Sequence, residues 1–151
     1  MVNLCAEYAG PEKQYKQLGI THLRLPTVDH FEPNLSDLEK AVAFIQQHKA
    51  QGSKVYVHCR AGHGRSAAVV FAWLLSKDPD VNLMDLNVEL FRIRNVRKKL
   101  WKQPNIRAFH AKLQGKGRHT SREDEVDIEL TTPDEHSSSD MEDESDHPKE
   151  L

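Results

Sequence analysis

The sequence is poor in cysteine and in long apolar runs. It contains two cysteines, Cys5 and Cys59, in 151 residues. Two are too few for a disulfide-built scaffold, and they lack the C-x-x-C spacing of common metal sites. No apolar run approaches the roughly 18 residues that a membrane-spanning helix needs. The first ten residues also lack the pattern of a signal peptide. We therefore expect an intracellular protein, cytoplasmic or mitochondrial, with no targeting signal in this chain.

The net charge of −2 hides two oppositely charged parts. Residues 1–114 hold 17 Lys and Arg against 10 Asp and Glu, a net charge of +7, whereas residues 115–151 hold 4 against 13, a net charge of −9. The basic part is long enough for one core and should attract anionic substrates. The acidic part has almost no large apolar residues, so we predict a domain at 1–114 and a disordered tail at 115–151 that solvates the domain or folds back on it.

Short strand-like segments alternate with longer helix-like ones in the basic part. The expected strands are residues 2–5, 22–26 and 54–58, and the expected helices are residues 34–52, 66–77, 82–100 and 105–113. The strands are short runs that include β-branched residues, and the helices carry apolar residues at helical spacing. This alternation predicts an α/β protein with a central sheet flanked by helices.

Two of the expected helices show a clear apolar face. In residues 34–52 the face consists of Leu38, Ala41, Val42 and Ile45, and in residues 82–100 it consists of Leu83, Leu86, Leu90 and Ile93. Ser36 and Glu39 have the spacing of a capping box, which predicts where the first of these helices begins.

The segment HCRAGHGRS, residues 58–66, places a cysteine directly after a strand and an arginine directly before a helix. Gly62 and Gly64 allow a loop whose backbone N–H groups point inward at a phosphate, and the helix start adds its positive end. The same field favours a thiolate, so Cys59 should have a lowered pKa and act as a nucleophile. An inert buried thiol is the alternative.

The residues after the cysteine have distinct expected roles in this loop. The planar fork of Arg65 can hold two phosphoryl oxygens, and Ser66 can donate a hydrogen bond to the sulfur when it becomes the leaving group. The expected substrate-binding residues are Arg60, Ala61, Gly62, His63, Gly64 and Arg65. The side chains of Arg60 and His63 either face the anionic substrate or point to solvent, and His58 is expected to support the loop.

A thiolate that displaces an alcohol from a phosphate ester also needs an acid to protonate the leaving oxygen, because an alkoxide is a poor leaving group. TVDHFEP, residues 27–33, offers Asp29 in a loop between an expected strand and an expected helix. Asp29 is the predicted acid, and Glu32 is the reserve.

The Cys-x5-Arg-Ser loop resembles the signature of the protein-tyrosine-phosphatase superfamily, in particular the dual-specificity phosphatases. Residues 2–110 are similar to the mitochondrial protein-tyrosine-phosphatase-like group, best known for a phosphatidylglycerophosphate phosphatase. The matching features are Glu7 and Tyr8, LRLPTVD with Asp29, and HCRAGHGRSA. The resemblance implies a phosphocysteine intermediate, no metal or cofactor, and an Asp-bearing loop that swings over the phosphate. Its implied substrate is a phosphomonoester on a protein tyrosine, serine or threonine, or on an anionic phospholipid.

The sequence departs from this family at its start, because phosphatases of this fold begin with further strands and a helix. Here Met1 falls almost inside the first expected strand. The sheet should therefore lack the N-terminal strands, and either the chain is shortened or another chain covers the sheet edge. A phosphate-binding module without catalysis is the alternative function.

Other features leave open alternatives. Cys5 is either a resolving thiol for an oxidised Cys59 or a packed strand residue. The basic run 92–102 is either a solvated helix face or a peripheral contact with acidic lipid. No zinc or aromatic RNA-binding motif supports a nucleic-acid partner, and the sequence does not indicate the oligomeric state.

Overall fold

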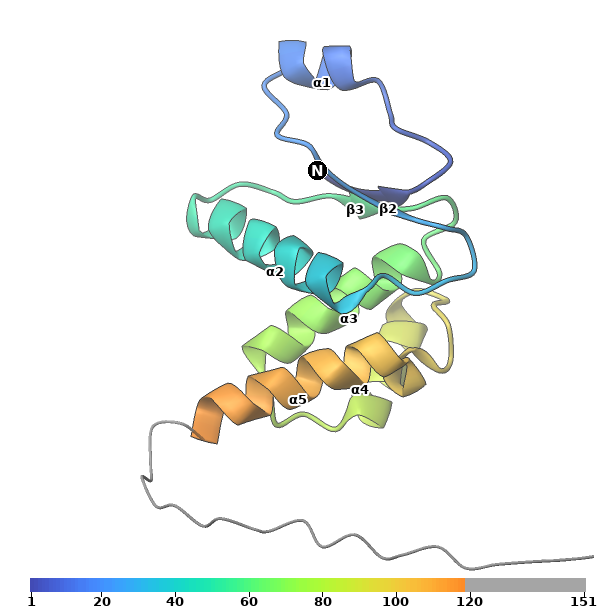
Figure 1. Ribbon diagram of the computed structural model, residues 1–151, viewed down its shortest axis with the longest axis vertical. Helices are drawn as coiled ribbons and strands as arrows, with labels where there is room; N and C mark the ends of the chain where they lie inside the picture. Colours follow the sequence, from blue (N-terminus) through green and yellow to red (C-terminus); the bar gives the residue numbers. More distant parts are fainter. Residues whose placement is uncertain (119–151) are drawn as a thin grey trace, which may run out of the picture.

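A computed structural model describes residues 1–118 as alternating strands and helices (Figure 1). In chain order the elements are β1 (Val2–Cys5), α1 (Glu12–Gln17), β2 (Leu23–Thr27), α2 (Leu35–Ala50), β3 (Val57–His58), α3 (Arg65–Lys77), α4 (Leu83–Ile93), the 3-10 helix η1 (Leu100–Lys102) and α5 (Pro104–Arg118). The α/β class and the three strands are confirmed. The short helix α1 is an addition that the sequence did not predict, because it has no apolar face and buries none of its residues.

The three strands form one parallel sheet in the order β2-β1-β3. Val2 on the central strand pairs with Leu23 of β2 and with Val57 of β3, and every residue of β1 is buried. The carboxyl ends of parallel strands meet at one edge of a sheet. The loops that follow β1, β2 and β3 therefore lie together, and they carry the predicted site residues.

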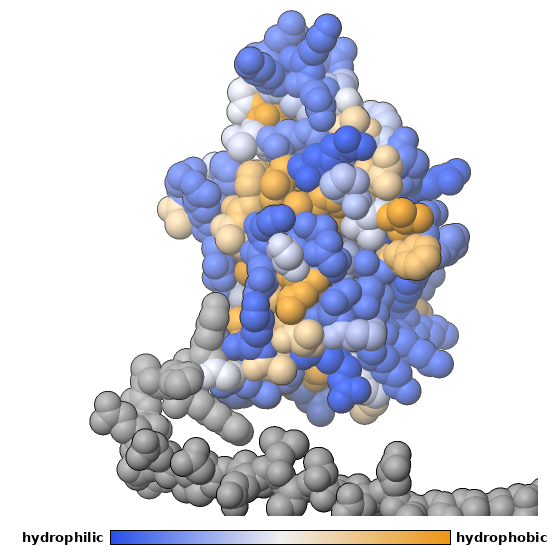
Figure 2. Space-filling model, in the orientation of Figure 1, coloured by the Kyte–Doolittle hydropathy of each residue, from blue (hydrophilic) through white to orange (hydrophobic). Residues whose placement is uncertain are grey.

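Helices α2 and α3 pack on one face of the sheet, and α5 packs beneath them (Figure 1). The largest buried side chains of this core include Leu4, Leu38, Val69, Phe71, Leu75, Leu100 and Ile106. The predicted apolar face of α2 is confirmed in full, since all four of its residues are buried. Helix α1 lies on the other side of the sheet, and Figure 2 shows it as almost entirely hydrophilic.

The chain that leaves β1 is folded back by the fully buried side chain of Asn3. Its Nδ2 donates to the carbonyls of Tyr8, at 2.8 Å, and Ala9, at 3.2 Å, while its Oδ1 accepts from the N–H of Cys5 at 2.8 Å. A buried amide costs free energy unless such bonds are made. Asn3 thus fixes the loop of residues 6–9 over the carboxyl end of the sheet.

The predicted capping box at the start of α2 is wrong. The helix begins at Leu35, and its N-cap is Asn34, whose Oδ1 accepts from the N–H of Asp37 at 2.8 Å. Asn is as good a cap as Ser, and it directly follows Pro33 and the loop that leaves β2. Ser36 therefore lies inside the first turn rather than before it.

The predicted helix over residues 82–100 is also too long, because α4 ends at Ile93. Ile93 is 82% exposed rather than part of the core. Beyond it the chain becomes extended at Arg94 and is held by the buried Asn87, whose Nδ2 donates to the Arg97 carbonyl at 3.0 Å. Tertiary hydrogen bonds here override a helical pattern that continues in the sequence.

At the other end of the described chain, α5 continues to Arg118, four residues past the predicted domain boundary after Gln114. A helix that is already formed gains one backbone hydrogen bond per added residue, which offsets the cost of a glycine of about 1 kcal/mol. The rest of the predicted acidic tail, residues 119–151, lies outside the described residues. None of the helices within residues 1–118 is long and apolar enough to cross a membrane.

Candidate active site

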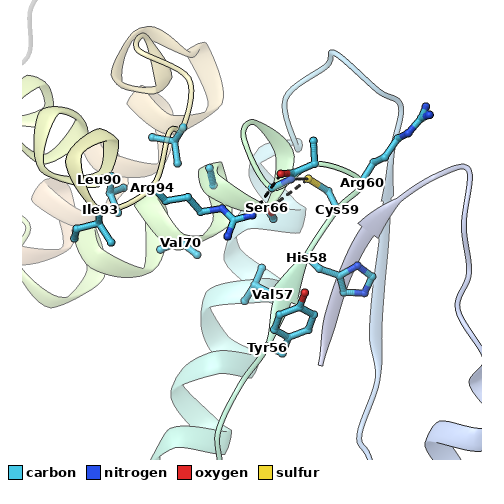
Figure 3. A pocket seen from close by; sticks show the side chains of 14 residues that line it. Tyr56, Val57, His58, Cys59, Arg60, Ser66, Val70, Leu90, Ile93 and Arg94 are labelled. Carbon is cyan, nitrogen blue, oxygen red and sulfur yellow. Dashed lines mark hydrogen bonds between the residues drawn. The ribbon is translucent and has the colours of Figure 1, made fainter.

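The phosphate loop connects β3 to α3 and surrounds the sulfur of Cys59 with hydrogen-bonding groups (Figure 3). The N–H of Gly62 donates to Sγ at 3.3 Å, and Oγ of Ser66, in the first turn of α3, lies 3.2 Å from Sγ. Gly62 has a φ of 77°, a left-handed conformation that favours glycine. The loop thus turns the backbone N–H of Gly62 toward the sulfur.

These contacts decide the ionisation of Cys59. Burial of the half-exposed thiol opposes its ionisation, but hydrogen bonds from Ser66 and Gly62 and the positive charge of Arg65 outweigh it, so that the pKa is lowered. A lowered pKa makes more of the nucleophilic thiolate available near neutral pH. Both cysteines of the chain are free thiols.

Gly64 plays a different part from the one the sequence indicated. Its φ of −121° is open to any residue, so it does not supply a left-handed conformation. A Cβ added at Gly64 lies only 3.0 Å from Nε of Arg97, and one added at Gly62 lies 2.6 Å from Nη2 of Arg94. Gly64 therefore makes room for an arginine side chain that packs against the loop.

Arg65 is the most constrained side chain of the site, and it is 2% exposed. Nη1 and Nη2 each donate to one carboxylate oxygen of Glu7 at 2.8 Å, and Nη1 also donates to the Thr27 carbonyl at 2.9 Å. Nη2 lies 3.0 Å from Oδ1 of Asp29. The guanidinium is thus held by the loops that follow β1 and β2.

The fork between Arg65 and Glu7 changes both ionisation equilibria. Hydrogen bonding to Arg65 lowers the pKa of Glu7 to about 2, and the same contact raises the pKa of Arg65. A planar, bidentate pair between a guanidinium and a carboxylate forms stronger hydrogen bonds than neutral groups do. Glu7 is therefore ionised at any physiological pH and fixes the orientation of the arginine.

The two candidate acids occupy different places. Asp29 lies two residues after the end of β2, is exposed and contacts Arg65. Glu32 accepts from the N–H of Asn105 at 3.4 Å and so faces the start of α5. Burial raises the pKa of Glu32. Of the two carboxylates, only Asp29 makes a contact with the phosphate-loop arginine.

The remaining predicted loop residues point in several directions. Figure 3 shows Arg60 extending away from Cys59, and His58 turned aside with its ring stacked on Tyr56 at 5.5 Å. His63 is exposed, and its Nδ1 hydrogen-bonds to the Asn95 carbonyl. His58 thus lies outside the groups that hydrogen-bond the sulfur. Cys5, at the end of β1, is buried, and burial raises the pKa of its thiol.

A pocket of about 280 Å³ adjoins the loop on the side of α4 (Figure 3). Its walls come from β3, the loop, α3 and the end of α4, and its lining includes Cys59, Val57, Val70, Leu90, Ile93 and Arg94. Arg94 extends toward Cys59 and Ser66 across this pocket, and its Nη2 donates to the Ala61 carbonyl at 3.4 Å. The sulfur therefore borders a mainly apolar cavity with a guanidinium in it.

Three contributors to the site were not assigned a role from the sequence, namely Glu7, Arg94 and Arg97. A usable signal exists for Glu7, because it lies two residues after a strand that is parallel to the strand before Cys59. No such signal exists for the two arginines, since the helical pattern continues through them. Their position depends on where α4 ends.

Comparisons with known proteins agree with this geometry. The mouse "Phosphatidylglycerophosphatase and protein-tyrosine phosphatase 1" is 47% identical over 64 residues, which cover 42% of this chain and 33% of the mouse chain. The Arabidopsis thaliana "Phosphatidylglycerophosphate phosphatase PTPMT2" is 33% identical over 98 residues, or 64% of this chain and 41% of that one. The chain thus spans between a third and two fifths of the length of these relatives.

The fold is also shared with a solved structure. The crystal structure of PTPMT1 in complex with PI(5)P superposes with a TM-score of 0.67 at 29% identity, covering 77% of this chain and 78% of that one. Residues 1–109 match the family model described as "Dual specificity phosphatase, catalytic domain". That match includes every residue of the phosphate loop and both carboxylates on Arg65, and the chain therefore belongs to the dual specificity phosphatase family.

Proposed function

We propose that the chain is a cysteine-dependent phosphatase that hydrolyses phosphomonoesters on anionic phospholipids through a phosphocysteine intermediate. The observation that carries the chemistry is the arrangement of Cys59, whose sulfur borders Ser66 and Gly62, next to a buried Arg65 with Asp29 at 3.0 Å. Membership of a phosphatase family supports hydrolysis of a phosphate ester.

In the first step the Cys59 thiolate attacks phosphorus in line with the ester oxygen. The S–P bond forms as the P–O bond to the leaving group breaks, and protonated Asp29 gives its proton to the leaving oxygen. Backbone N–H groups of residues 60–64 and the guanidinium of Arg65 stabilise the charge on the transferring group. The alcohol then leaves.

In the second step a water molecule attacks the phosphocysteine. The Asp29 carboxylate takes a proton from the water, the new P–O bond forms and the S–P bond breaks, which releases inorganic phosphate and the thiolate. Ser66 donates a hydrogen bond to the departing sulfur. Asp29 ends this step protonated, ready for the next substrate.

Arg65 has to exchange a partner when a phosphate binds. Its two hydrogen bonds to Glu7 and one to the Thr27 carbonyl hold the plane of the guanidinium, while Asp29 makes a single ion-pair contact from an exposed loop. The phosphate dianion displaces Asp29 from Nη2, because it carries more charge. The freed carboxyl group then faces the leaving oxygen.

A phospholipid suits the surroundings of the loop. The mainly apolar pocket beside Cys59 offers a place for the uncharged part of an amphiphilic substrate, and Arg94 offers a cation beside it. The names of the relatives and the PI(5)P bound in the PTPMT1 structure point to the same substrate class. The exposed lysines Lys98 and Lys99 continue the basic run and favour contact with an acidic bilayer.

The proposed thiolate nucleophile also favours a reducing compartment of the cell. A thiolate that must stay reduced works in the cytoplasm or in mitochondria rather than in an oxidising space. Activity should accordingly disappear on treatment with peroxide and return with a thiol reductant.

The chemistry is tested by measuring phosphate release by the purified chain and by its Cys59→Ser variant. The variant should lose turnover while still binding phosphate, because only the nucleophile is removed. Cys5→Ala is the control for loss of a thiol and should stay active. Equal turnover by Cys59→Ser and the parent would end the proposal. Tight vanadate binding by the parent without turnover would favour the alternative, a phosphate-binding module.

The substrate class is tested on PI(5)P in phosphatidylcholine vesicles and on a phosphotyrosine peptide. Ile93→Glu places a charge at the exposed rim of the pocket and should raise KM for the vesicle substrate, with little effect on the peptide. Val88→Glu, also on α4 but not in the pocket lining, is the matched control. Preference of the parent for the peptide would contradict the lipid assignment and leave the chemistry intact.

A further inference from the structure

The segment that follows α4 lies across the outer side of the phosphate loop. The N–H of Arg97 donates to the His63 carbonyl at 2.8 Å, and the Asn95 carbonyl bonds Nδ1 of His63. Nη2 of Arg94 donates to the Ala61 carbonyl at 3.4 Å. Residues 94–97, which we call the clasp, are therefore joined to the loop through both backbone and side chains.

The side chain of Arg97 connects the loop to the turn that carries Asp29. It passes against Gly64, where an added Cβ lies 3.0 Å from Nε, and its Nη1 donates to the His30 carbonyl at 3.2 Å. Arg97 as a whole residue is partly buried, and its side chain joins two segments that are far apart in sequence. The Arg97 side chain thus makes a direct hydrogen bond from the clasp to the turn that carries Asp29.

The residue it holds, His30, is in a conformation that needs support. Its φ of 68° lies in the left-handed region, which residues with a side chain adopt rarely and keep only when their surroundings fix it. In this conformation the N–H of His30 donates to Oδ1 of Asp29 at 3.0 Å. The bond from Arg97 to the His30 carbonyl therefore holds the backbone of the residue whose N–H orients the Asp29 carboxyl group.

The backbone of Arg97 is secured independently of its side chain. Its carbonyl accepts from Nδ2 of Asn87, which is 1% exposed and whose Oδ1 accepts from the N–H of Trp101. A change of the Arg97 side chain should therefore leave the clasp on the phosphate loop and release only the Asp29 turn. This separation makes the role of the side chain testable.

We propose that Arg97 is a positioning residue that ties the Asp29 turn to the phosphate loop, so that the carboxyl group stays within reach of Arg65 and of the leaving oxygen. The proposal rests on the phosphatase chemistry proposed above for the step that it affects. The link that Arg97 makes between the two segments can be tested whether or not that chemistry is correct.

The kinetic test uses Arg97→Met on p-nitrophenyl phosphate, whose leaving group needs little protonation, and on phenyl phosphate, whose leaving group needs more. Loss of one bond from a charged donor should lower kcat on phenyl phosphate by about tenfold, with less than about a twofold change on p-nitrophenyl phosphate. The effect should vanish in an Asp29→Asn background. Arg97→Lys should restore part of the rate, and Arg107→Met, which removes an exposed arginine of α5, should behave as the parent. Equal slowing of both substrates, or the same slowing without Asp29, would overturn the proposal.

The structural test does not depend on turnover. Amide hydrogen exchange in residues 28–31 should be faster in Arg97→Met than in the parent and in Arg107→Met, while exchange in residues 60–64 should stay the same. Unchanged exchange in the Asp29 turn would overturn the tie even if the enzyme proved active. If the parent showed no phosphatase turnover but residues 28–31 still exchanged faster in Arg97→Met, the tie would be supported and the proposed chemistry would be wrong.

Discussion

The phosphate loop and the side chains that surround it reach the same site in different ways. Residues 58–66 are contiguous, and they supply the proposed nucleophile, its hydrogen-bond partners and the arginine from one strand-loop-helix unit. Glu7, Asp29 and Arg97 come from three separate segments and meet only because the sheet is parallel and α4 ends where it does. The loop is thus a local structure, whereas its surroundings are a tertiary one.

This difference separates binding from turnover. In the proposed mechanism the local unit holds the phosphate and ionises the thiol, while the assembled groups orient Arg65 and supply the proton. Changes within the loop should therefore impair phosphate binding or the nucleophile itself. Changes around the loop should reduce turnover and leave binding largely intact.

After the loss of turnover in Cys59→Ser, the largest of these effects should come from Arg65→Lys. An ammonium group cannot hold two phosphoryl oxygens and two carboxylate oxygens in one plane, so kcat should fall by about 10²–10³-fold and vanadate affinity should fall with it. Steady-state kinetics and vanadate inhibition measure the two quantities. Arg107→Lys, on an exposed turn of α5, is the control. Retained vanadate affinity in Arg65→Lys would contradict the assignment of binding to the local unit.

Asp29→Ala should produce a comparable loss in rate but a different pattern. Removal of a general acid should lower kcat on phenyl phosphate by about 10²-fold, with vanadate affinity unchanged or higher, because a competing carboxylate leaves Arg65. Glu32→Ala is the matched control, since Glu32 faces Asn105 rather than Arg65. If Glu32→Ala proved the slower variant, the acid would have to be reassigned.

The same division explains what the sequence could and could not predict. The loop, the three strands and the buried face of α2 follow from short-range patterns, and all are present. The end of α4 at Ile93 does not follow from them, because it depends on Asn87 and His63 bonding to a segment whose own pattern is helical. The role of Arg97 depends on that tertiary structure and emerges only with the fold, whereas Glu7 follows a strand of the predicted sheet and could have been found from the sequence.

Glu7→Gln tests the orientation of Arg65 alone. The amide keeps the shape of the side chain but replaces one charged acceptor with a donor, so one bond of the fork is lost and kcat should fall by about tenfold. Because the pKa of Glu7 is about 2, the parent fork is intact throughout the neutral range, and the loss should not vary with pH there. Glu12→Gln, on the exposed helix α1, should leave kcat unchanged. A loss confined to acidic pH would contradict this role.

The smallest effect should come from Ser66→Ala, and it should appear as a change in pH dependence. The thiolate is the reactive form, so kcat/KM rises as the pH passes upward through the pKa of Cys59, which is lowered in the parent by Ser66 and Gly62 against the effect of burial. Loss of the Ser66 hydroxyl should move that rise to higher pH and cost about fivefold in rate near neutral pH. The rate of iodoacetamide alkylation at Cys59, followed by mass spectrometry across a pH series, reports the same shift without a substrate. Ser76→Ala, at the far end of α3, should not move it. An alkylation profile that is the same in Ser66→Ala and the parent would mean that the backbone of the loop ionises the thiol alone, and the local unit would then be smaller than residues 58–66.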